Sequence, residues 1–535
     1  MKTMISSIIL ASCLALPLAS CSDSDVAPEQ KDWSTTTYFY SADAAMQDTY
    51  YKPTVGYVGD PMPFFDPVAG DFKVLYLQDF RPNPEGTYHP IWGVSTKDAA
   101  HYTSLGELVA CGTKKSQDAA IGTGSTIYDE ASKLYYTFYT GNKYLPTGDE
   151  SAQAVMVATS PDFKTWTKDR TFLLKGQDFG YDKNDFRDPF VFKGDDGKFH
   201  MLISTKKGGK GSLAEFVSDD LKNWTDNGVF MTMMWDRFYE CPDLFKMGDY
   251  WYLVYSEIHH AVRRVQYFKG RTLDELKACT ANDVARWPDA HEGFLDSRGL
   301  YAGKTASDGT NRYLWGWCPT RSGKDNTAVG ASPAEPEWGG NLVCYKLIQH
   351  EDGTLTLGQV DAVSEKYNQD VAVEVKESQN MTEADGTYTL AGNVEQPDAY
   401  MLMGRLGNHN KISFTVTTSN EWDKFGISMV RGSDSKKYYT MVVNPENENN
   451  RKVNFEEQGV EGKGFIAGID GYVFARPADN VYNITIYTDN SICVMYINDV
   501  CSYTNRIYGI QKNCWSIDSF NGANVKVSNL KISQY

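Results

Sequence analysis

Apolar and polar residues alternate with a period of two along most of the chain, in short runs that turn residues separate. This period places successive side chains on opposite faces of a strand, so it predicts half-buried β-strands. Two such runs in residues 191–203 flank Asp195-Asp-Gly197, and Asp and Gly tolerate the positive φ of a hairpin turn. Helical spacing is plausible mainly in Thr272 to Ala285. We therefore expect an all-β fold.

A loosely repeated unit recurs at uneven intervals between residues 57 and 357. It consists of an aromatic-rich strand pair, a turn, and a strand that ends in a motif with Ser, Asp and Trp. The clearest copies are residues 158–166 and 216–224, with a weaker echo at residues 92–98. Units of this size built from four short strands are typical of propeller blades. We therefore expect a five-bladed β-propeller over residues 38–362.

The pattern changes after a connector at residues 360–369. From about residue 370 the alternating runs become longer, as in Lys411 to Thr417 and Tyr482 to Ile497. Long alternating strands without the motif with Ser, Asp and Trp favour a β-sandwich. We expect residues 370–535 to form a C-terminal sandwich that acts as a structural brace.

The N-terminus has the features of a signal peptide over residues 1–20. Lys2 supplies the charged start, and an apolar run from Met4 to Leu18 follows, too short to span a membrane as a mature helix. Leu18-Ala-Ser-Cys21 resembles a bacterial lipobox, which implies cleavage before Cys21 and acylation of its thiol. Residues 21–37 then form a tether, and we expect a lipid anchor in the bacterial outer membrane, facing the periplasm or the cell surface.

Charge and cysteine content narrow the function classes. The formal net charge of -17 would repel nucleic acid over most of the surface, so neutral substrates fit better. The eight cysteines after Cys21 include no CxxC pair and show no metal-binding spacing. They are free thiols in the simpler interpretation, although Cys493 and Cys501 could pair across a hairpin. We expect neither a metal nor another cofactor.

Three carboxylates stand beside prolines at the heads of predicted strands, in Gly59-Asp60-Pro61, Arg187-Asp188-Pro189 and Glu240-Cys241-Pro242. A single Asp-Pro pair is usually a solvated turn. The first strands of propeller blades, however, line one central funnel, so acids at their heads can converge. Two converging carboxylates suffice to hydrolyse a glycosidic bond, and a third can orient the sugar.

The chain resembles glycoside hydrolase family 32, the fructosidases that include invertases, inulinases and levanases. Two motifs of that family stand intact, Arg187-Asp188-Pro189 and Glu240-Cys241. Further matches follow in collinear order over both domains: Gln78, Trp92-Gly93, Gly122-Thr-Gly-Ser125, Phe138-Tyr-Thr-Gly141, Leu295-Asp-Ser-Arg-Gly-Leu-Tyr-Ala302, Leu314-Trp-Gly-Trp317, Glu337-Trp-Gly-Gly340 and Arg506-Ile-Tyr508.

The resemblance implies a retaining hydrolase of β-fructosidic bonds in fructans or sucrose-like oligosaccharides. Asp60 would be the nucleophile that forms a covalent fructosyl-enzyme, Glu240 the acid and base, and Asp188 the stabiliser of the transition state. The residues expected to bind substrate are Arg187, Gln78, Trp92, Ser125, Tyr301 and Trp315. Either tryptophan could instead be buried in the hydrophobic core and make no contact with substrate.

The nucleophile motif departs from the family, because Gly59 and Met62 stand where the family usually has two Asn residues. A missing amide leaves a sugar hydroxyl without a hydrogen bond, at a cost of roughly 1–3 kcal/mol. Two other interpretations therefore stay open: a hydrolase of the same fold that acts on another glycoside, and a non-catalytic glycan-binding relative.

Overall fold

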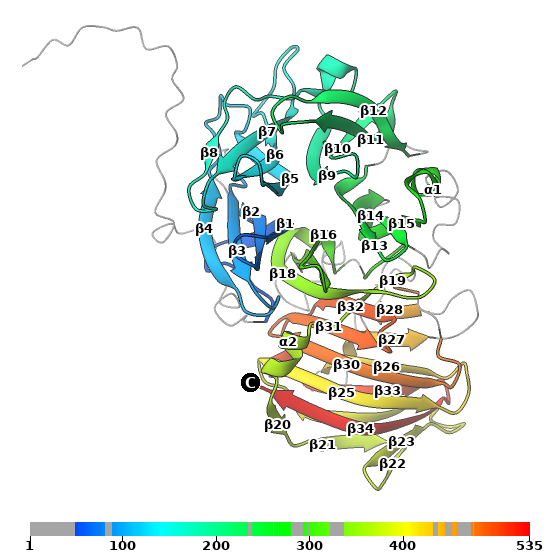
Figure 1. The fold of residues 1–535 in the computed structure, drawn as a ribbon. Helices are drawn as coiled ribbons and strands as arrows, with labels where there is room; N and C mark the ends of the chain where they lie inside the picture. The colour runs from blue at the N-terminus through cyan, green and yellow to red at the C-terminus, as the bar shows by residue number, and fades with distance from the viewer. Residues whose placement is uncertain are drawn as a thin grey trace, which may run out of the picture.

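The computed structural model describes residues 49–535, except 81–87, 234–237, 260–261, 280–292, 298, 322–335, 432–436, 445–451, 457–471 and 474–475. Strands build two domains, a ring of sheets and a sandwich beneath it in the view of Figure 1. The all-β expectation is confirmed. The expected signal peptide, Cys21 and the tether lie outside the described residues. None of the helices in the described part is long and apolar enough to cross a membrane.

Four antiparallel sheets, one of them shared by the first and last blades, surround a central axis (Figure 1) and confirm the five-bladed propeller. The first blade holds β1 (Tyr57–Asp66), β2 (Asp71–Asp79), β3 (Ile91–Thr96) and β4 (Thr103–Val109); the second β5 (Ala120–Asp129), β6 (Leu134–Asn142), β7 (Gln153–Ser160) and β8 (Thr167–Lys168); the third β9 (Phe186–Lys193), β10 (Phe199–Lys207), β11 (Lys210–Ser218) and β12 (Thr225–Thr232). The fourth holds β13 (Glu240–Met247), β14 (Tyr250–His259) and β15 (Val262–Gly270); the fifth β16 (Tyr301–Ser307), β17 (Arg312–Arg321), β18 (Pro336–Gln349) and β19 (Leu355–Gly358).

The ring closes because β1 pairs with β18 at Val58 and Gly340, which joins the first and last blades in one sheet. Short helices η3 (Gly176–Phe179) and α1 (Leu273–Ala278) lie between strands. The helix expected over residues 272–285 is thus observed as α1, and its predicted end falls on residues that are not described.

The innermost strand of every blade carries a β-bulge. Its register with the second strand shifts at residues 58–61 in β1, 122–124 in β5, 187–190 in β9, 240–243 in β13 and 301–304 in β16. A bulge inserts an unpaired residue, bends the strand and re-aims the side chains beside it. Asp60, Asp188 and Glu240 all lie in these segments, so the same irregularity recurs at each predicted acid.

The repeated motif with Ser, Asp and Trp forms the turn between the third and fourth strands of a blade. Asp162 Oδ1 accepts hydrogen bonds from the backbone N–H groups two and three positions later, and Asp220 Oδ1 does the same. This is the local bonding by which Asp favours turns. The backbone donors also lower the pKa of Asp220 to about 2.

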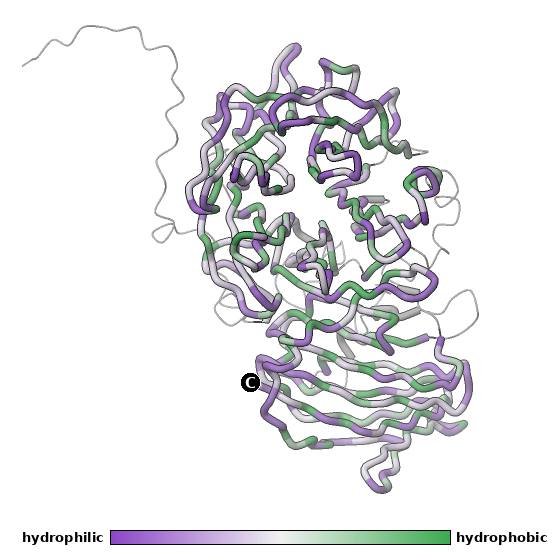
Figure 2. Tube along the Cα trace, viewed as in Figure 1, coloured by the Kyte–Doolittle hydropathy of each residue, from purple (hydrophilic) through white to green (hydrophobic). Residues whose placement is uncertain are grey.

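Two sheets of antiparallel strands form the sandwich, as expected (Figure 1). One sheet has the order β22 (Met381–Ala384), β23 (Thr387–Ala391), β34 (Asn524–Gln534), β25 (His409–Thr418), β30 (Val481–Asp489), β31 (Ile492–Ile497) and β32 (Cys501–Arg506), with β20 (Gln369–Val371) on β34. The other has the order β21 (Val375–Gln379), β24 (Ala399–Arg405), β33 (Cys514–Phe520), β26 (Lys424–Arg431), β27 (Lys437–Asn444), β28 (Lys452–Glu456) and β29 (Tyr472–Val473). Figure 2 shows hydropathy alternating along these strands.

Two short helices lie in the connector and in the sandwich. The connector contains helix α2 (Asp361–Lys366), and η6 (Ile510–Lys512) precedes β33. The alternative of a disulfide between Cys493 and Cys501 is wrong, because strand register places Cys493 opposite Asn505 and Cys501 opposite Ile497. All eight cysteines after Cys21 are free thiols.

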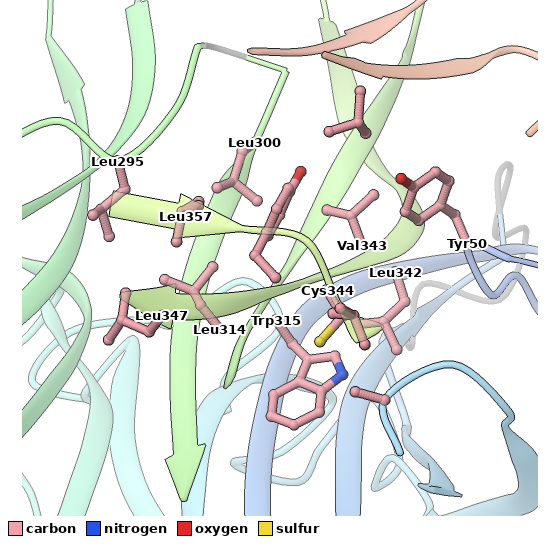
Figure 3. Close-up of a cluster of buried hydrophobic side chains, with 14 of the residues drawn as sticks. Tyr50, Leu295, Leu300, Leu314, Trp315, Leu342, Val343, Cys344, Leu347 and Leu357 are labelled. Carbon is pink, nitrogen blue, oxygen red and sulfur yellow. The ribbon is translucent and has the colours of Figure 1, made fainter. Parts of the chain in front are cut away.

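The two domains share an apolar core. Tyr487 and Tyr496 of the sandwich belong to the same buried cluster as Leu314, Leu342 and Leu347 of the fifth blade. Figure 3 shows the propeller side of this cluster, where β17, β18 and β19 meet. Burial of this apolar surface binds the sandwich to the ring.

Buried polar residues fix how the domains meet. The Asp296 carboxylate accepts hydrogen bonds from the Thr504 N–H at 2.8 Å, the Thr504 hydroxyl at 2.7 Å and the Ser502 hydroxyl at 3.0 Å. Arg506 of β32 donates to the carbonyl oxygens of Cys318 and Pro319, both at 3.0 Å. These directional bonds connect β32 to the propeller segments that precede β16 and end β17.

Replacing Asp296 by Ala should leave the buried N–H groups of Thr504 and Ser297 without their acceptor, whereas the Ser502 hydroxyl keeps the Leu295 carbonyl. Because each unpaired buried group costs about 1–3 kcal/mol, we expect the free energy of unfolding to fall by about 3 kcal/mol or more. Urea denaturation followed by circular dichroism measures this change. Asp219→Ala is the control, since the Asp219 side chain is 83% exposed. Equal urea midpoints for the two variants would contradict this account of the interface.

Candidate active site

The three predicted acids meet at the inner strands of the propeller. The inner strands β1, β5, β9, β13 and β16 contact one another around the ring. The backbone N–H of Cys241, next to Glu240, donates to Asp188 Oδ2 at 2.9 Å. The charges of Asp60 and Glu240 also raise the pKa of Asp188, although burial raises it more. The expected convergence of the acids is therefore observed.

Asp60 lies in the β1 bulge and accepts two hydrogen bonds. Thr123 Oγ1 donates to Asp60 Oδ2 at 2.6 Å, and Trp317 Nε1 donates to Asp60 Oδ1 at 2.8 Å. Burial raises the pKa of Asp60, while these two donors lower it by stabilising the ionised form. The two donors orient both oxygens of a carboxylate that is only partly exposed.

Glu240 begins β13 and has different partners. Arg187 Nη2 donates to Glu240 Oε1 at 2.8 Å, and the Tyr301 hydroxyl donates to Glu240 Oε2. Burial and the Glu240 charge raise the pKa of Tyr301 well above its usual range, so its hydroxyl keeps its proton. The Glu240 side chain is 20% exposed. It is thus held at both oxygens but remains accessible.

Asp188 is the most buried of the three acids. Its backbone has a φ of 58°, which a non-glycine residue rarely adopts, and its N–H donates to Thr140 Oγ1 at 2.8 Å. Burial raises the pKa of Asp188 to about 6, although the guanidinium of Arg187 lowers it. Asp188 is therefore ionised at neutral pH and becomes protonated in mild acid.

Arg187 joins the acids of the third and fourth blades. Its Nε lies 4.0 Å from Asp188 Oδ2, its Nη1 lies 2.9 Å from Asp185 Oδ1, and its guanidinium stacks 4.0 Å above the Phe238 ring. Burial disfavours its charge, but the charges of Glu240 and Asp188 outweigh burial and raise the pKa of Arg187. Arg187 thus stays cationic and offsets the like charges around it.

Sequence reasoning assigned no role to Thr123, Trp317 or Lys304. Thr123 and Trp317 stand inside matched motifs and hold Asp60, whereas Lys304 lies just beyond such a motif. The fully buried Lys304 Nζ donates to the Gly124 carbonyl at 2.7 Å, and burial lowers its pKa while nearby acids oppose this shift. The signal for Thr123 and Lys304 was their position on the inner strands β5 and β16. Trp317 lies on β17, the second strand of its blade, and its signal was the matched motif Leu314-Trp-Gly-Trp317.

Several residues expected to bind substrate make internal contacts instead. Gln78 is fully buried, and its Nε2 donates to the Val55 carbonyl at 2.5 Å. The Ser125 hydroxyl donates to the Pro189 carbonyl at 2.9 Å and accepts from the Val191 N–H at 2.8 Å, which ties β5 to β9. The hydrogen bonds of both side chains therefore hold parts of the propeller together.

The two predicted tryptophans differ in their surroundings. Trp315 is fully buried within the interdomain cluster (Figure 3), where its ring contacts Phe72, and its Nε1 donates to the Tyr102 hydroxyl at 3.1 Å. A sugar cannot reach Trp315, so this residue packs in the core and does not bind substrate as expected. Trp317, two residues later, contacts Asp60 instead. Trp92 is partly exposed on β3 beside Phe80, and its role stays a prediction.

The arrangement can perform nucleophilic and acid–base chemistry at one carbon centre. Asp60 offers an oriented carboxylate, Glu240 an accessible carboxyl group, and Asp188 a buried negative charge beside them. Within the described part of the chain, His, Cys, Asp and Glu nowhere form a group of three placed to hold a metal ion.

Comparisons with known proteins agree with this geometry. The family model "Glycosyl hydrolases family 32 N-terminal domain" matches residues 50–361, and "GH32, BT1760-like, C-terminal domain" matches residues 353–532. The insoluble β-fructofuranosidase isoenzyme CWINV2 of Arabidopsis thaliana is 26% identical over 310 residues, 52% of this chain and 50% of its own. The sucrose-6-phosphate hydrolase of Vibrio alginolyticus is 26% identical over 240 residues, 42% of this chain and 45% of its own. The chain thus spans about half the length of these curated relatives.

Solved structures share the fold over nearly the whole chain. Exo-inulinase from Aspergillus awamori has a TM-score of 0.69 at 15% identity and covers 93% of this chain and 99% of its own. Sucrose-6-phosphate hydrolase from Lactobacillus gasseri has a TM-score of 0.66 at 18% identity and covers 92% of this chain and 95% of its own. With both domain models matched in order, the chain belongs to glycoside hydrolase family 32.

Proposed function

We propose that the protein is a retaining glycoside hydrolase that cleaves β-fructosidic bonds in fructans of the levan or inulin type, or in sucrose-like oligosaccharides. The observation that carries the proposal is the meeting of Asp60, Asp188 and Glu240, each with its own set of hydrogen-bond donors. Family membership supports the reaction class, as do relatives named as β-fructofuranosidases and sucrose-6-phosphate hydrolases.

Asp60 is the nucleophile. Its carboxylate attacks the anomeric carbon of the fructosyl unit, and a covalent ester forms as the bond to the leaving oxygen breaks. Thr123 and Trp317 favour the ionised carboxylate and fix its direction of attack. Such positioning removes part of the entropic barrier to the first step.

Glu240 protonates the leaving oxygen in the first step. In the second step it removes a proton from water, whose oxygen attacks the anomeric carbon and releases fructose and Asp60. Arg187 and Tyr301 bind its two oxygens and hold the carboxyl group in place through both steps. Different environments for two carboxyl groups are the usual way to separate a nucleophile from an acid.

Asp188 stabilises the positive charge that develops on the sugar ring. A buried charge acts strongly because the surrounding dielectric is low. Arg187 favours the ionised form of Asp188 against the effect of burial. The pKa of about 6 keeps Asp188 ionised at neutral pH but not in mild acid.

Hydrolysis of a substrate panel tests the proposal. Protein that lacks residues 1–21 should release reducing sugar from levan, inulin or sucrose but not from an arabinan control, and NMR of the first product should show a retained anomer. Asp60→Asn should lower kcat by about 10⁴-fold or more, as loss of a nucleophile does. Glu240→Gln should lower kcat by about 10²–10⁴-fold. An inverted anomer, or release from arabinan alone, would instead favour the hydrolase of another glycoside.

The pH dependence of kcat/KM tests the electrostatics. Below pH about 6 Asp188 takes up a proton and loses its stabilising charge, so kcat/KM should fall there. Arg187→Gln removes a positive charge that lowers the Asp188 pKa, so the acid limb should move to higher pH. Arg405→Gln, an exposed arginine of the sandwich, is the matched control. An acid limb that does not move would show that Arg187 leaves the ionisation of Asp188 unchanged.

We also propose that the protein is held to the bacterial outer membrane by acylation of Cys21, on the support of Leu18-Ala-Ser-Cys21. Because several acyl chains give stable anchoring, the full-length protein should sediment with membranes until detergent is added. Cys21→Ser should shift it to the soluble fraction, whereas Cys13→Ser, inside the apolar run, should not. An equal distribution of the two variants would contradict the anchor.

A further inference from the structure

The bulge of β5 links two of the three proposed catalytic acids. Thr123 Oγ1 donates to Asp60 Oδ2 at 2.6 Å, and the Thr123 carbonyl accepts from the Thr140 hydroxyl at 2.9 Å. The oxygen of the same hydroxyl accepts from the Asp188 N–H at 2.8 Å. The position of this bulge therefore sets the orientation of the Asp60 carboxylate and the place of the Asp188 backbone.

Lys304 of β16 binds the next residue of this bulge. Both β5 and β16 contact β1, so they lie on either side of the strand that carries the nucleophile. Lys304 Nζ donates to the Gly124 carbonyl at 2.7 Å and lies 5.3 Å from the centroid of the Phe190 ring. The Gly124 N–H donates to Met62 Sδ at 3.1 Å, so Met62, the second departure in the nucleophile motif, also holds the bulge. Lys304 is 2% exposed, and a substrate cannot reach it.

The Lys304 ammonium group is buried among acidic side chains. Burial lowers the pKa of Lys304, and the charges of four nearby groups oppose that shift. These groups are Cys241, Asp243, Asp188 and Asp60. Burial raises the pKa of the Cys241 thiol well above its usual range, so the thiol is neutral at neutral pH. Because attraction between opposite charges is mutual, Lys304 favours the ionised forms of the three aspartates, and Arg312 does the same for Asp243.

The two hydrogen-bond donors described above for Asp60 carry no charge, in contrast to Arg187 beside Asp188. Burial raises the pKa of Asp60, its two donors lower it, and His89 adds a positive charge only when its ring is protonated. Lys304 therefore supplies the nucleophile with an attraction that its uncharged donors do not provide.

We infer that Lys304 is a positioning residue for the nucleophile: its bond to Gly124 fixes the bulge that holds Asp60, and its buried charge favours the ionised carboxylate. The inference rests on the proposed function. Because Lys304 acts through Thr123 and through its charge, and does not touch the sugar, it serves the chemical step and not the binding of substrate.

The split between kcat and KM tests the bond to Gly124. Lys304→Met keeps the length of the side chain but has neither an N–H donor nor a charge. Without this bond the bulge should hold Asp60 less firmly, so kcat should fall about 10–100-fold while KM stays within about threefold. A kcat within about threefold of the unaltered protein, or a loss confined to KM, would overturn the inference.

The pH dependence of kcat/KM tests the buried charge. A cation lowers the pKa of nearby carboxyl groups, so its removal in Lys304→Met or Lys304→Gln should move the acid limb to higher pH, by about 0.5–1 pH unit. The control is Lys73→Met, because Lys73 is also buried, pairs with Asp71 at 2.7 Å and lies 5.8 Å from the centroid of the Phe163 ring. An acid limb that stays in place in both Lys304 variants would refute the role of the charge.

Thermal unfolding of each variant shows whether a loss of activity comes from the site or from the fold. A variant that keeps its unfolding temperature and loses kcat has lost positioning, and if Lys304→Met does not fold, Lys304→Gln carries the same pH test. If the unaltered protein hydrolyses no β-fructoside in the panel, the proposed function falls and the role of Lys304 with it. If the unaltered protein is active and the Lys304 variants match its kcat and its acid limb, only the inference falls.

Discussion

The β-bulge in the innermost strand of each blade is the constraint on which the site depends. A regular strand would send neighbouring side chains to opposite faces of its own blade. An unpaired residue breaks this alternation and re-aims the side chains beside it. Asp188 and Cys241 adopt φ values of 58° and 53° there, which a non-glycine backbone accepts only when its surroundings hold it. This local irregularity, repeated in all five blades, thus supplies the three acids and their partners Arg187, Thr123 and Tyr301.

The bulges bring the negative charges of the three acids close together, and the surrounding residues must offset their repulsion. Burial raises the pKa of both Asp60 and Asp188, which would neutralise them without nearby donors or cations. Arg187 lies between Asp188 and Glu240. Burial lowers the pKa of Lys304, and the nearby charges of Asp188 and Asp60 are among those that oppose this shift. Each acid therefore has its own balance of burial, charge and hydrogen bonds, and these separate environments allow neighbouring carboxyl groups to differ in role.

The sandwich acts on the site through the chain segments that it holds. Arg506 binds the carbonyl oxygens of Cys318 and Pro319, which directly follow Trp317, the donor to Asp60. Asp296, bonded to β32, lies shortly before Tyr301, the donor to Glu240. One edge strand of the sandwich therefore anchors a partner of the nucleophile and a partner of the acid. This supports the interpretation of the second domain as a brace.

Much of the fold followed from the sequence, because alternation with a period of two, turn chemistry and the blade repeat are local properties of the chain. The three acids stand near prolines in the sequence, and the collinear motifs of the family singled them out from other such sites. Their donors were harder to predict. Trp315 and Trp317 share a strand and a face, so periodicity could not tell which one stands at Asp60 and which one is buried in the core.

By itself, then, the sequence determined the two β domains, the acids and the family, all of which depend on local pattern or on motifs in order. The tertiary structure alone decided that Gln78 and Ser125 are used internally and that Gly59 faces the ring of Trp338. The Ser125 and Gly59 contacts join strands of different blades, and the Gln78 contact joins β2 to the segment before β1. Ring closure and side-chain volume set them, and no local pattern encodes either.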